Sequence, residues 1–124
     1  FHDAKTEKRD EVVLWGTGKP LREFLYVDDL ADALLHLMER YEDEKTINVG
    51  SGDEVTILEL AGIVSEVIGY RGKIVFDSTK PDGTPRKVLD STRMRDLGWK
   101  PKHTLAEGIR TTYDWVLKNG VFKN

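Results

Sequence analysis

The sequence predicts an α/β fold in which short strands alternate with amphipathic helices. Two observations carry this prediction. The spacing of the apolar residues changes several times along the chain, between the extended pattern of a strand and the i, i+3, i+4 pattern of a helix. Threonines followed three residues later by glutamates, the pattern of a capping box, stand directly before two of the helical runs. The sequence contains no internal repeat and no low-complexity tract, so one α/β unit accounts for all of it.

The composition is typical of a folded globular domain. Of the 124 residues, 39% are hydrophobic and 33% are charged, and the net charge is only −3. Acidic and basic residues are mixed along the chain, so we expect no nucleic-acid partner. We expect no membrane partner either, because no apolar run approaches the length of a membrane span. The sequence has no cysteine, which excludes disulfides and thiolate metal sites from it and fits a reducing cytosol.

The first 27 residues are expected to hold the end of a helix and two extended segments. Residues 1–10 have the pattern of a helix tail that breaks into a polar turn. Because the chain begins within this pattern, we expect it to be part of a longer protein. A strand is predicted at residues 11–15, ending in the turn at 16–20, and a second extended run covers residues 21–27.

A helix and a short strand are expected next. Apolar residues recur with helical spacing between Leu30 and Met38, and either Asp28 or Asp29 is the natural N-cap. A pair of catalytic carboxylates is the less favoured interpretation of the two aspartates, because a helix cap is needed at this point. The segment Thr46–Val49 has the pattern of a strand.

The rest of the chain continues the alternation. Thr56 and Glu59 form a capping box before a helix that ends at Gly69. The elements expected after it are a strand at residues 73–77, a polar loop at 78–86, a short helix around 94–97 that stops at Gly98, and a last helix behind the capping box of Thr104 and Glu107. The helices carry more apolar surface than these short strands can cover, which indicates that part of a sheet is missing.

Neither glycine-rich turn matches a nucleotide phosphate loop. The turn at residues 16–20 lacks the earlier glycine of a P-loop and has Pro20 in place of the required hydroxyl residue. The Gly-Ser-Gly turn at residues 50–52 lies between a strand and a helix, but Val55 stands where a dinucleotide fingerprint needs its third glycine. Tight turns with positive φ are the favoured interpretation of both.

Two residues and one loop are the candidate binding elements. Arg22 follows a tight turn, where its planar guanidinium could match phosphate oxygens; a surface ion pair with Glu23 is an equal alternative. Trp15 either stacks on a base or fills the core, and core packing is favoured. The segment 80–87 combines two prolines, a glycine, a carboxylate and three cations, which suits either a sugar diphosphate or a solvated connection.

No metal site and no catalytic residue set is predicted. His2, His36 and His103 lie far apart in the sequence and lack the spacing of metal ligands. We therefore assign no catalytic residue and no metal ligand to this chain.

Several segments resemble the C-terminal portion of extended short-chain dehydrogenases that act on nucleotide sugars. The shared motifs are Arg-Glu-Phe-Leu-Tyr-Val-Asp-Asp at residues 22–29, Asn-Val-Gly-Ser-Gly at 48–52, and Leu-Gly-Trp-x-Pro with Thr-Leu-x-Glu-Gly-Ile within 97–109. Two further segments, residues 13–24 and 76–87, are similar to the GDP-L-fucose synthases, and the second is the more specific. The resemblance covers nearly the whole chain.

The resemblance implies a fold. Residues 1–124 would form the C-terminal, substrate-binding part of such an enzyme, and its N-terminal Rossmann core would be missing. Residues 28–50 would return to the Rossmann layer as a late helix and strand.

The resemblance also implies four substrate-binding positions, at Trp15, Arg22, Asp82 and Lys87. Arg22 and Lys87 would neutralise the diphosphate, since a dianionic bridge needs several cations. Asp82 would accept hydrogen bonds from hydroxyl groups, and Trp15 would supply an apolar wall.

The implied function is that of an NADPH-dependent epimerase–reductase that converts GDP-4-keto-6-deoxymannose into GDP-L-fucose in the cytoplasm. NADP(H) would be bound mainly by the missing half and no metal would be needed, so this part alone would be inactive. The full-length enzyme would be a homodimer, and the isolated part would self-associate. The alternatives are another nucleotide-sugar epimerase or dehydratase, a non-catalytic nucleotide-sugar-binding module, or an α/β domain without a ligand.

Overall fold

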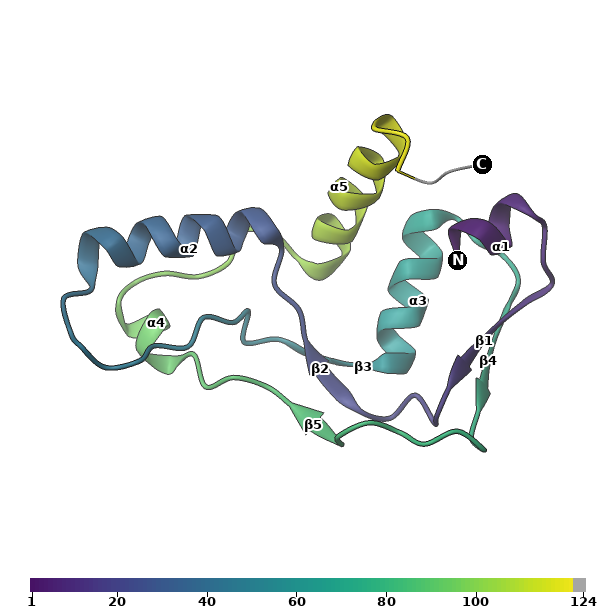
Figure 1. Cartoon of the computed structure of the whole chain (residues 1–124), viewed down its shortest axis with the longest axis horizontal. Helices are drawn as coiled ribbons and strands as arrows, with labels where there is room; N and C mark the ends of the chain where they lie inside the picture. Colours follow the sequence, from purple (N-terminus) through teal and green to yellow (C-terminus); the bar gives the residue numbers. More distant parts are fainter. Residues whose placement is uncertain (122–124) are drawn as a thin grey trace.

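The computed structural model describes residues 1–121, which form five helices and five strands (Figure 1). In chain order they are α1 (His2–Thr6), β1 (Glu11–Trp15), β2 (Leu21–Glu23), α2 (Val27–Arg40), β3 (Glu54–Thr56), α3 (Ile57–Ile68), β4 (Lys73–Asp77), β5 (Arg86–Lys87), α4 (Thr92–Asp96) and α5 (Leu105–Lys118). The predicted α/β class is confirmed.

The strands form two small sheets. In the first, β1 and β4 run parallel, with Trp15 opposite Asp77 at the end of both strands. In the second, β2 lies between an antiparallel β3 and a parallel β5. Figure 1 shows β1 and β4 beyond the end of the second sheet, with α3 and α5 on one side of it. Trp15 ends β1 and the turn that follows leads into β2, so the two sheets meet at this turn.

Several local predictions are confirmed. The strands β1 and β4 have the predicted bounds. Both capping boxes are present, since the Thr56 and Thr104 hydroxyls accept hydrogen bonds from the N–H groups of Glu59 and Glu107, and both glutamates bond back. Gly69 ends α3 in the left-handed conformation. Short-range chemistry therefore determines these boundaries.

The predicted N-cap of α2 is wrong. The helix begins at Val27 with Tyr26 as its N-cap, and no side chain makes a cap hydrogen bond there. Asp28 and Asp29 lie in the first turn instead, and Asp29 is only 2% exposed. Its carboxylate accepts hydrogen bonds from the backbone N–H and the Nδ1 of His103, at 3.0 and 2.9 Å. A long-range partner has therefore replaced the local cap.

The predicted strand at Thr46–Val49 is also wrong. None of the described strands pairs with this segment, and its apolar residues Ile47 and Val49 pack against the core instead. The strand that does form, β3, lies after the glycine turn, where Glu54 pairs with Glu23. A strand needs a partner with matching register, and sequence pattern alone does not supply one.

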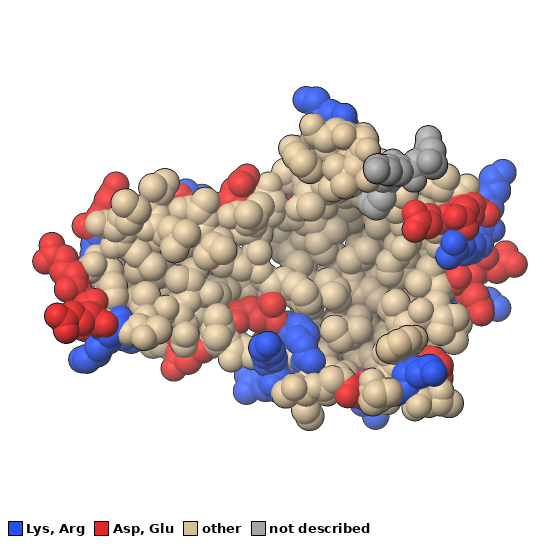
Figure 2. All heavy atoms as spheres, in the orientation of Figure 1, with Lys and Arg blue, Asp and Glu red and all other residues tan. Residues whose placement is uncertain are grey.

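A small cluster of buried apolar residues, Ala33, Met94 and Trp99, lies under α2. Other buried apolar residues, which lie outside this cluster, are Ala4, Ala61, Ile68 and Tyr70. Two hydrogen bonds to Asp32 of α2, from Trp99 Nε1 at 2.9 Å and from Lys102 Nζ at 2.5 Å, hold the segment after α4 against the helix. Figure 2 shows a face whose middle is mostly uncharged, with charged side chains gathered toward its edges.

Candidate functional site

The exposed indole of Trp15 marks the end of the first sheet. Its side chain is 73% exposed, so the favoured prediction of core packing is wrong for the described chain. The glycine turn after it has positive φ at Gly16 and Gly18, as predicted. Lys80 Nζ lies 5.8 Å from the centre of the Trp15 ring, within the range of a cation–π contact. The aromatic face therefore points toward the polar loop and away from the core.

Asp82 joins this turn to the polar loop. Its carboxylate accepts hydrogen bonds from the Thr17 N–H at 2.8 Å and from the Thr17 hydroxyl at 2.6 Å. Gly16 lies so close to the carboxylate that a side chain there would collide with it. The bonds from the Thr17 hydroxyl and N–H, with a smaller contribution from Lys19, hold the pKa of Asp82 below its ordinary value. Asp82 is therefore an ionised acceptor beside Trp15.

Arg22 and Lys87 form a pair of cations on one face of the second sheet. The two residues are register partners on the parallel strands β2 and β5. Directly paired residues project their side chains from the same face, so two positive charges lie side by side. Among residues 1–121, no carboxylate lies within ion-pair distance of either cation. Adjacent like charges are unfavourable by themselves, which makes this face a candidate anion site.

The polar loop also reaches Arg22. A Cβ atom added at Gly83 would lie 3.0 Å from Arg22 Nη2, so the loop backbone runs against the guanidinium. Arg22 Nη1 donates a hydrogen bond to the Leu21 carbonyl at 2.7 Å. The alternative of an ion pair between Arg22 and Glu23 does not occur. Arg86 shows the contrast, because its guanidinium bonds both oxygens of Glu54 at 2.6 Å.

The structure thus brings the four predicted positions into one region. Trp15 and Asp82 meet through the Gly16–Thr17 turn, Arg22 and Lys87 meet through strand pairing, and the polar loop connects the two pairs. Sequence reasoning missed the role of Thr17, whose hydroxyl between two glycines was the available signal. It also missed the backbone contacts of Glu23, whose carboxylate accepts hydrogen bonds from the N–H groups of Gly52 and Leu89, because no local pattern indicates them.

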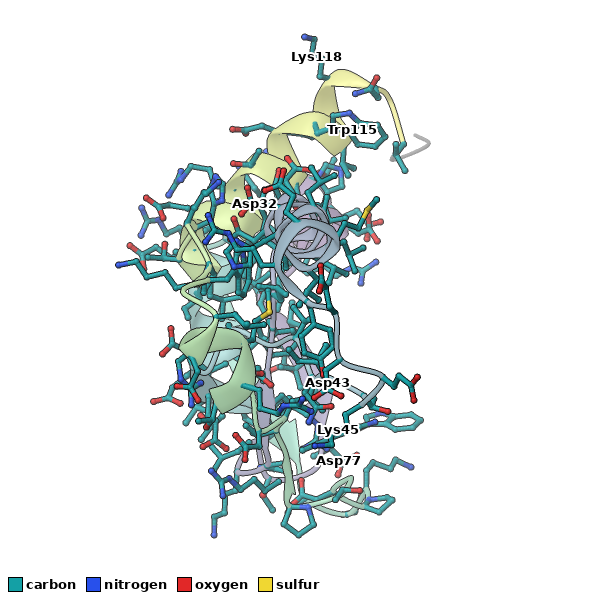
Figure 3. All side chains as sticks on the ribbon, turned by 90° about the vertical axis from the view of Figure 1, so that its left-hand side faces the viewer. Asp32, Asp43, Lys45, Asp77, Trp115 and Lys118 are labelled. Carbon is teal, nitrogen blue, oxygen red and sulfur yellow. The ribbon has the colours of Figure 1, made fainter. Side chains whose placement is uncertain are left out.

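Trp15, Asp82 and Lys87 of this region are exposed, and Arg22 is half-buried. A cavity of about 380 Å³ exists elsewhere, between the residues after β2 and the start of α5, where Phe24, Tyr26, His103 and Ile109 line it. None of the four predicted residues lines that cavity. Figure 3 shows Asp77, at the end of β4 near the loop, far below Asp32 of α2. The contacts around α2 are therefore separate from the candidate site.

The glycine turn at residues 50–52 does not fit the pyrophosphate of a dinucleotide. The Gly52 N–H, which such a turn would offer to phosphate, donates instead to Glu23 Oε1 at 2.6 Å. Gly50 lies against the same carboxylate. A carboxylate where phosphate would sit excludes this turn as the phosphate loop for NADP(H).

The histidines are dispersed in the fold. His36 bonds the Leu97 carbonyl at 2.9 Å, His103 bonds Asp29, and His2 bonds the Tyr113 hydroxyl at 3.0 Å. No group of three or more His, Asp or Glu side chains suited to a metal ion occurs among residues 1–121. Within the same residues, no helix has the length and apolar character needed to cross a membrane.

Comparison with known proteins relates the chain to enzymes of nucleotide-sugar metabolism. The model of the NAD dependent epimerase/dehydratase family matches residues 1–50. GDP-L-fucose synthase 1 of Arabidopsis thaliana is 59% identical over 119 residues, which cover 96% of this chain and 37% of that protein. The GDP-L-fucose synthase of Escherichia coli K12 is 48% identical over 96% of the chain and 40% of its own length.

The solved structures that resemble this chain are also enzymes that act on nucleotide sugars. A GDP-L-fucose synthetase from Naegleria fowleri, bound to NADP, superimposes with a TM-score of 0.87 at 31% identity, over 98% of this chain and 38% of that chain. A UDP-glucose 4-epimerase from Thermotoga maritima gives a TM-score of 0.79 at 30% identity, over 95% of this chain and 38% of its own. The chain thus spans less than half the length of these relatives and aligns with their C-terminal part. In sequence and in fold, the chain is therefore similar to the C-terminal part of GDP-L-fucose synthases, and its residues 1–50 match the model of the NAD dependent epimerase/dehydratase family.

Proposed function

We propose that the chain is the substrate-binding portion of an NADPH-dependent, cytoplasmic epimerase–reductase that makes GDP-L-fucose from GDP-4-keto-6-deoxymannose. The observation that carries the proposal is that Arg22 and Lys87 project from one face beside the loop that holds Asp82, and that neither forms an ion pair with a carboxylate within residues 1–121. Two adjacent cations match a diphosphate better than a single charge, because a guanidinium and an ammonium can share its oxygens.

Each residue has a distinct proposed role. Arg22 binds phosphate oxygens through its planar fork, and Lys87 adds a second, mobile charge. Asp82 is ionised and already accepts two hydrogen bonds from Thr17, while its oxygens retain lone pairs for a substrate hydroxyl. Trp15 offers an exposed aromatic face for a base or sugar ring. Together these groups hold and orient the substrate, and such positioning contributes several kcal/mol to catalysis.

The proposed reaction needs groups from outside these 124 residues. Inversion at two carbons beside a keto group requires general acid–base residues, and the final reduction requires hydride from NADPH. We assign no catalytic residue to the chain, and its glycine turn at residues 50–52 does not fit the cofactor phosphates. The isolated chain is therefore proposed to bind the substrate without converting it. Its proposed contacts with the substrate do not require the cofactor.

Calorimetric titration with GDP-fucose, run beside UDP-glucose, tests the proposal. We expect preferential binding of the GDP sugar, with a loss of at least tenfold in affinity in Arg22→Ala. Arg86→Ala is the matched control, because Arg86 lies next to Lys87 on β5 but bonds Glu54 instead of facing Arg22. Unchanged affinity in Arg22→Ala, with circular dichroism showing a folded chain, would contradict the assigned role.

A second candidate is a related enzyme that acts on a UDP sugar. The similarity in fold to the UDP-glucose 4-epimerase of Thermotoga maritima favours considering it. Equal or tighter binding of UDP-glucose in the same titration would support this alternative. A non-catalytic binding module is a third candidate. Finding a cofactor-binding half encoded in frame upstream of this chain would exclude that candidate.

The proposed arrangement in the longer protein also concerns α2. Residues 28–50, which include most of this helix, are proposed to return to the cofactor-binding layer, and the complete enzyme is proposed to be a homodimer. The helix exposes Val27, Leu30, Leu34 and Met38, which recur at spacings of three and four residues. Without another layer over this stripe, we propose that the isolated chain self-associates.

A further inference from the structure

The position of Lys87 depends on a very short strand. β5 contains only Arg86 and Lys87, and it pairs with β2 at the edge of the second sheet. One backbone hydrogen bond just before it, from Leu21 N–H to the Pro85 carbonyl, measures 2.9 Å. A two-residue edge strand has few ladder bonds to hold it, so its end needs another anchor.

Glu23 supplies that anchor. Its Oε2 accepts a hydrogen bond from the Leu89 N–H at 3.0 Å, and its Oε1 accepts one from the Gly52 N–H at 2.6 Å. Leu89 is two residues beyond the end of β5, and Gly52 is two residues before the start of β3. A single carboxylate thus extends the sheet on both sides of β2, beyond the last backbone pairs.

The close approach of Gly50 shows how tightly this carboxylate is enclosed. A Cβ atom at this position would lie 2.5 Å from Oε1 and 2.8 Å from Cδ of Glu23, both too close for a real contact. Gly50 is not one of the glycines with positive φ, so an alanine there would meet no backbone strain but would force the Glu23 carboxylate to move. The glycine therefore leaves space for the carboxylate.

The strand geometry separates Glu23 from the candidate anion site. Successive side chains alternate between the two faces of a strand, so Glu23 projects away from the face that carries Arg22 and Lys87. Its register partner Glu54 projects with it and bonds Arg86. Glu23 therefore does not neutralise Arg22, although it is the next residue in the chain.

We propose that Glu23 is a positioning residue that holds Lys87 beside Arg22 by binding the backbone on both sides of β2. This inference rests on the proposed function, since it names what maintains the spacing of the two cations that bind the diphosphate. Both contacts are made to backbone N–H groups, so the effect on the ligand is indirect and acts through strand spacing.

Two variants test the inference. In Glu23→Gln, the amide keeps one acceptor but turns an NH₂ donor toward one of the two backbone N–H groups. In Gly50→Ala, the new Cβ displaces the carboxylate while its charge is kept. Glu107→Gln is the matched control, because Glu107 also accepts two hydrogen bonds, both at 2.8 Å, from Thr104 in the capping box of α5.

NMR measures the spacing of β2 and β5, and calorimetry measures the affinity for GDP separately. In ¹⁵N-labelled chain, we expect faster amide exchange at Gly52 and Leu89, and weaker backbone NOEs between Arg22 and Lys87, in both test variants but not in the control. Calorimetry with GDP should show about a tenfold loss of affinity in both test variants, while Glu107→Gln lowers only the melting temperature.

The inference is overturned if Glu23→Gln and Gly50→Ala keep the Arg22–Lys87 NOEs, or if the control loses as much affinity for GDP as they do. A wild-type chain that binds no GDP would refute the proposed function in this chain. The NOE and exchange comparison would still decide the role of Glu23, so the two failures are distinguishable.

Discussion

At the scale of single residues, carboxylates join segments that are far apart in the sequence. Glu23 binds the backbone at Gly52 and Leu89, Asp82 binds Thr17, and Asp29 binds His103. Each carboxylate accepts at least two hydrogen bonds, which suits an ionised group with several lone pairs. Within residues 1–121, neither Arg22 nor Lys87 of the candidate site has a carboxylate as an ion-pair partner, in contrast to these structural contacts.

Asp29 predicts a specific pH dependence of stability. Burial alone would raise the pKa of Asp29, but the hydrogen bonds from the side chain and backbone of His103 outweigh it and lower the pKa below the ordinary value of 3.8. A depressed folded-state pKa stabilises the fold above the unfolded value, and this stabilisation is lost as the pH falls below about 4. We expect the free energy of unfolding to decrease below about pH 4 with a shallower slope in Asp29→Asn than in the wild-type chain.

Urea unfolding between pH 2.5 and 7 checks this prediction. Other carboxylates with lowered pKa, such as Asp82 and Glu54, also lose stabilising bonds in acid, so the wild-type slope contains their contributions. The difference between the two proteins isolates Asp29. Identical slopes would show that its bonds to His103 are not maintained in solution.

At the scale of single elements, α3 shows how local rules determine a helix. It begins at a complete capping box and ends at Gly69, which has φ +75°. Gly62 lies in its interior, and a Cβ added there meets no described atom within 4 Å. The C-cap Gly69 therefore needs the left-handed conformation that glycine adopts readily, whereas the interior Gly62 has no structural need for glycine.

The two glycines predict stability changes of opposite sign. Gly62→Ala should raise the free energy of unfolding by about 0.5–1 kcal/mol, because alanine loses less backbone entropy in a helix interior. Gly69→Ala should lower it by about 1–2 kcal/mol, because a Cβ in the left-handed region is strained. Urea unfolding of both variants measures the contrast. Destabilisation by Gly62→Ala would mean that another surface packs against this position.

At the scale of the whole molecule, the described part leaves much apolar surface uncovered. Met38 is 82% exposed and Leu34 is 52% exposed on α2, and Trp115 is 60% exposed on α5. Figure 3 shows Trp115 and Lys118 near the outer end of α5, away from the sheets. The small core under α2 covers only one side of that helix. Surfaces of this kind commonly mark contacts with another layer or another chain.

This surface predicts concentration-dependent association. In sedimentation velocity, we expect the wild-type chain to shift to larger species as its concentration rises. The double variant Leu34→Lys/Met38→Lys should reduce the shift, because it places two charges on the stripe. Leu58→Lys is the control, since Leu58 is 55% exposed but lies on α3. A wild-type chain that stays monomeric at high concentration would contradict the prediction.

The sequence predicted most of the elements but fewer of the contacts. Strands β1 and β4 are apolar runs bounded by turn residues, and α3 and α5 have capping boxes, so short-range chemistry was sufficient for them. Thr46–Val49 has a strand-like pattern but no partner, and Asp29 has a long-range partner that a local rule does not anticipate. Residue chemistry indicated Arg22, Trp15 and the loop at residues 80–87 as candidates, and family resemblance supplied the four substrate-binding positions, whose role as ligands is a proposal.

By itself, the sequence determined where α3 and α5 begin, where α3 ends, and which family the chain resembles, because these depend on residues a few positions apart. Only the tertiary structure decided that Arg22 lies beside Lys87 and that Asp82 binds Thr17. The same is true of the Glu23 carboxylate, which binds the backbone beside both β3 and β5. These contacts join residues 29 to 66 positions apart, or depend on strand register. Register is set by the packing of whole strands, and a shift of one residue would move Lys87 to the opposite face from Arg22.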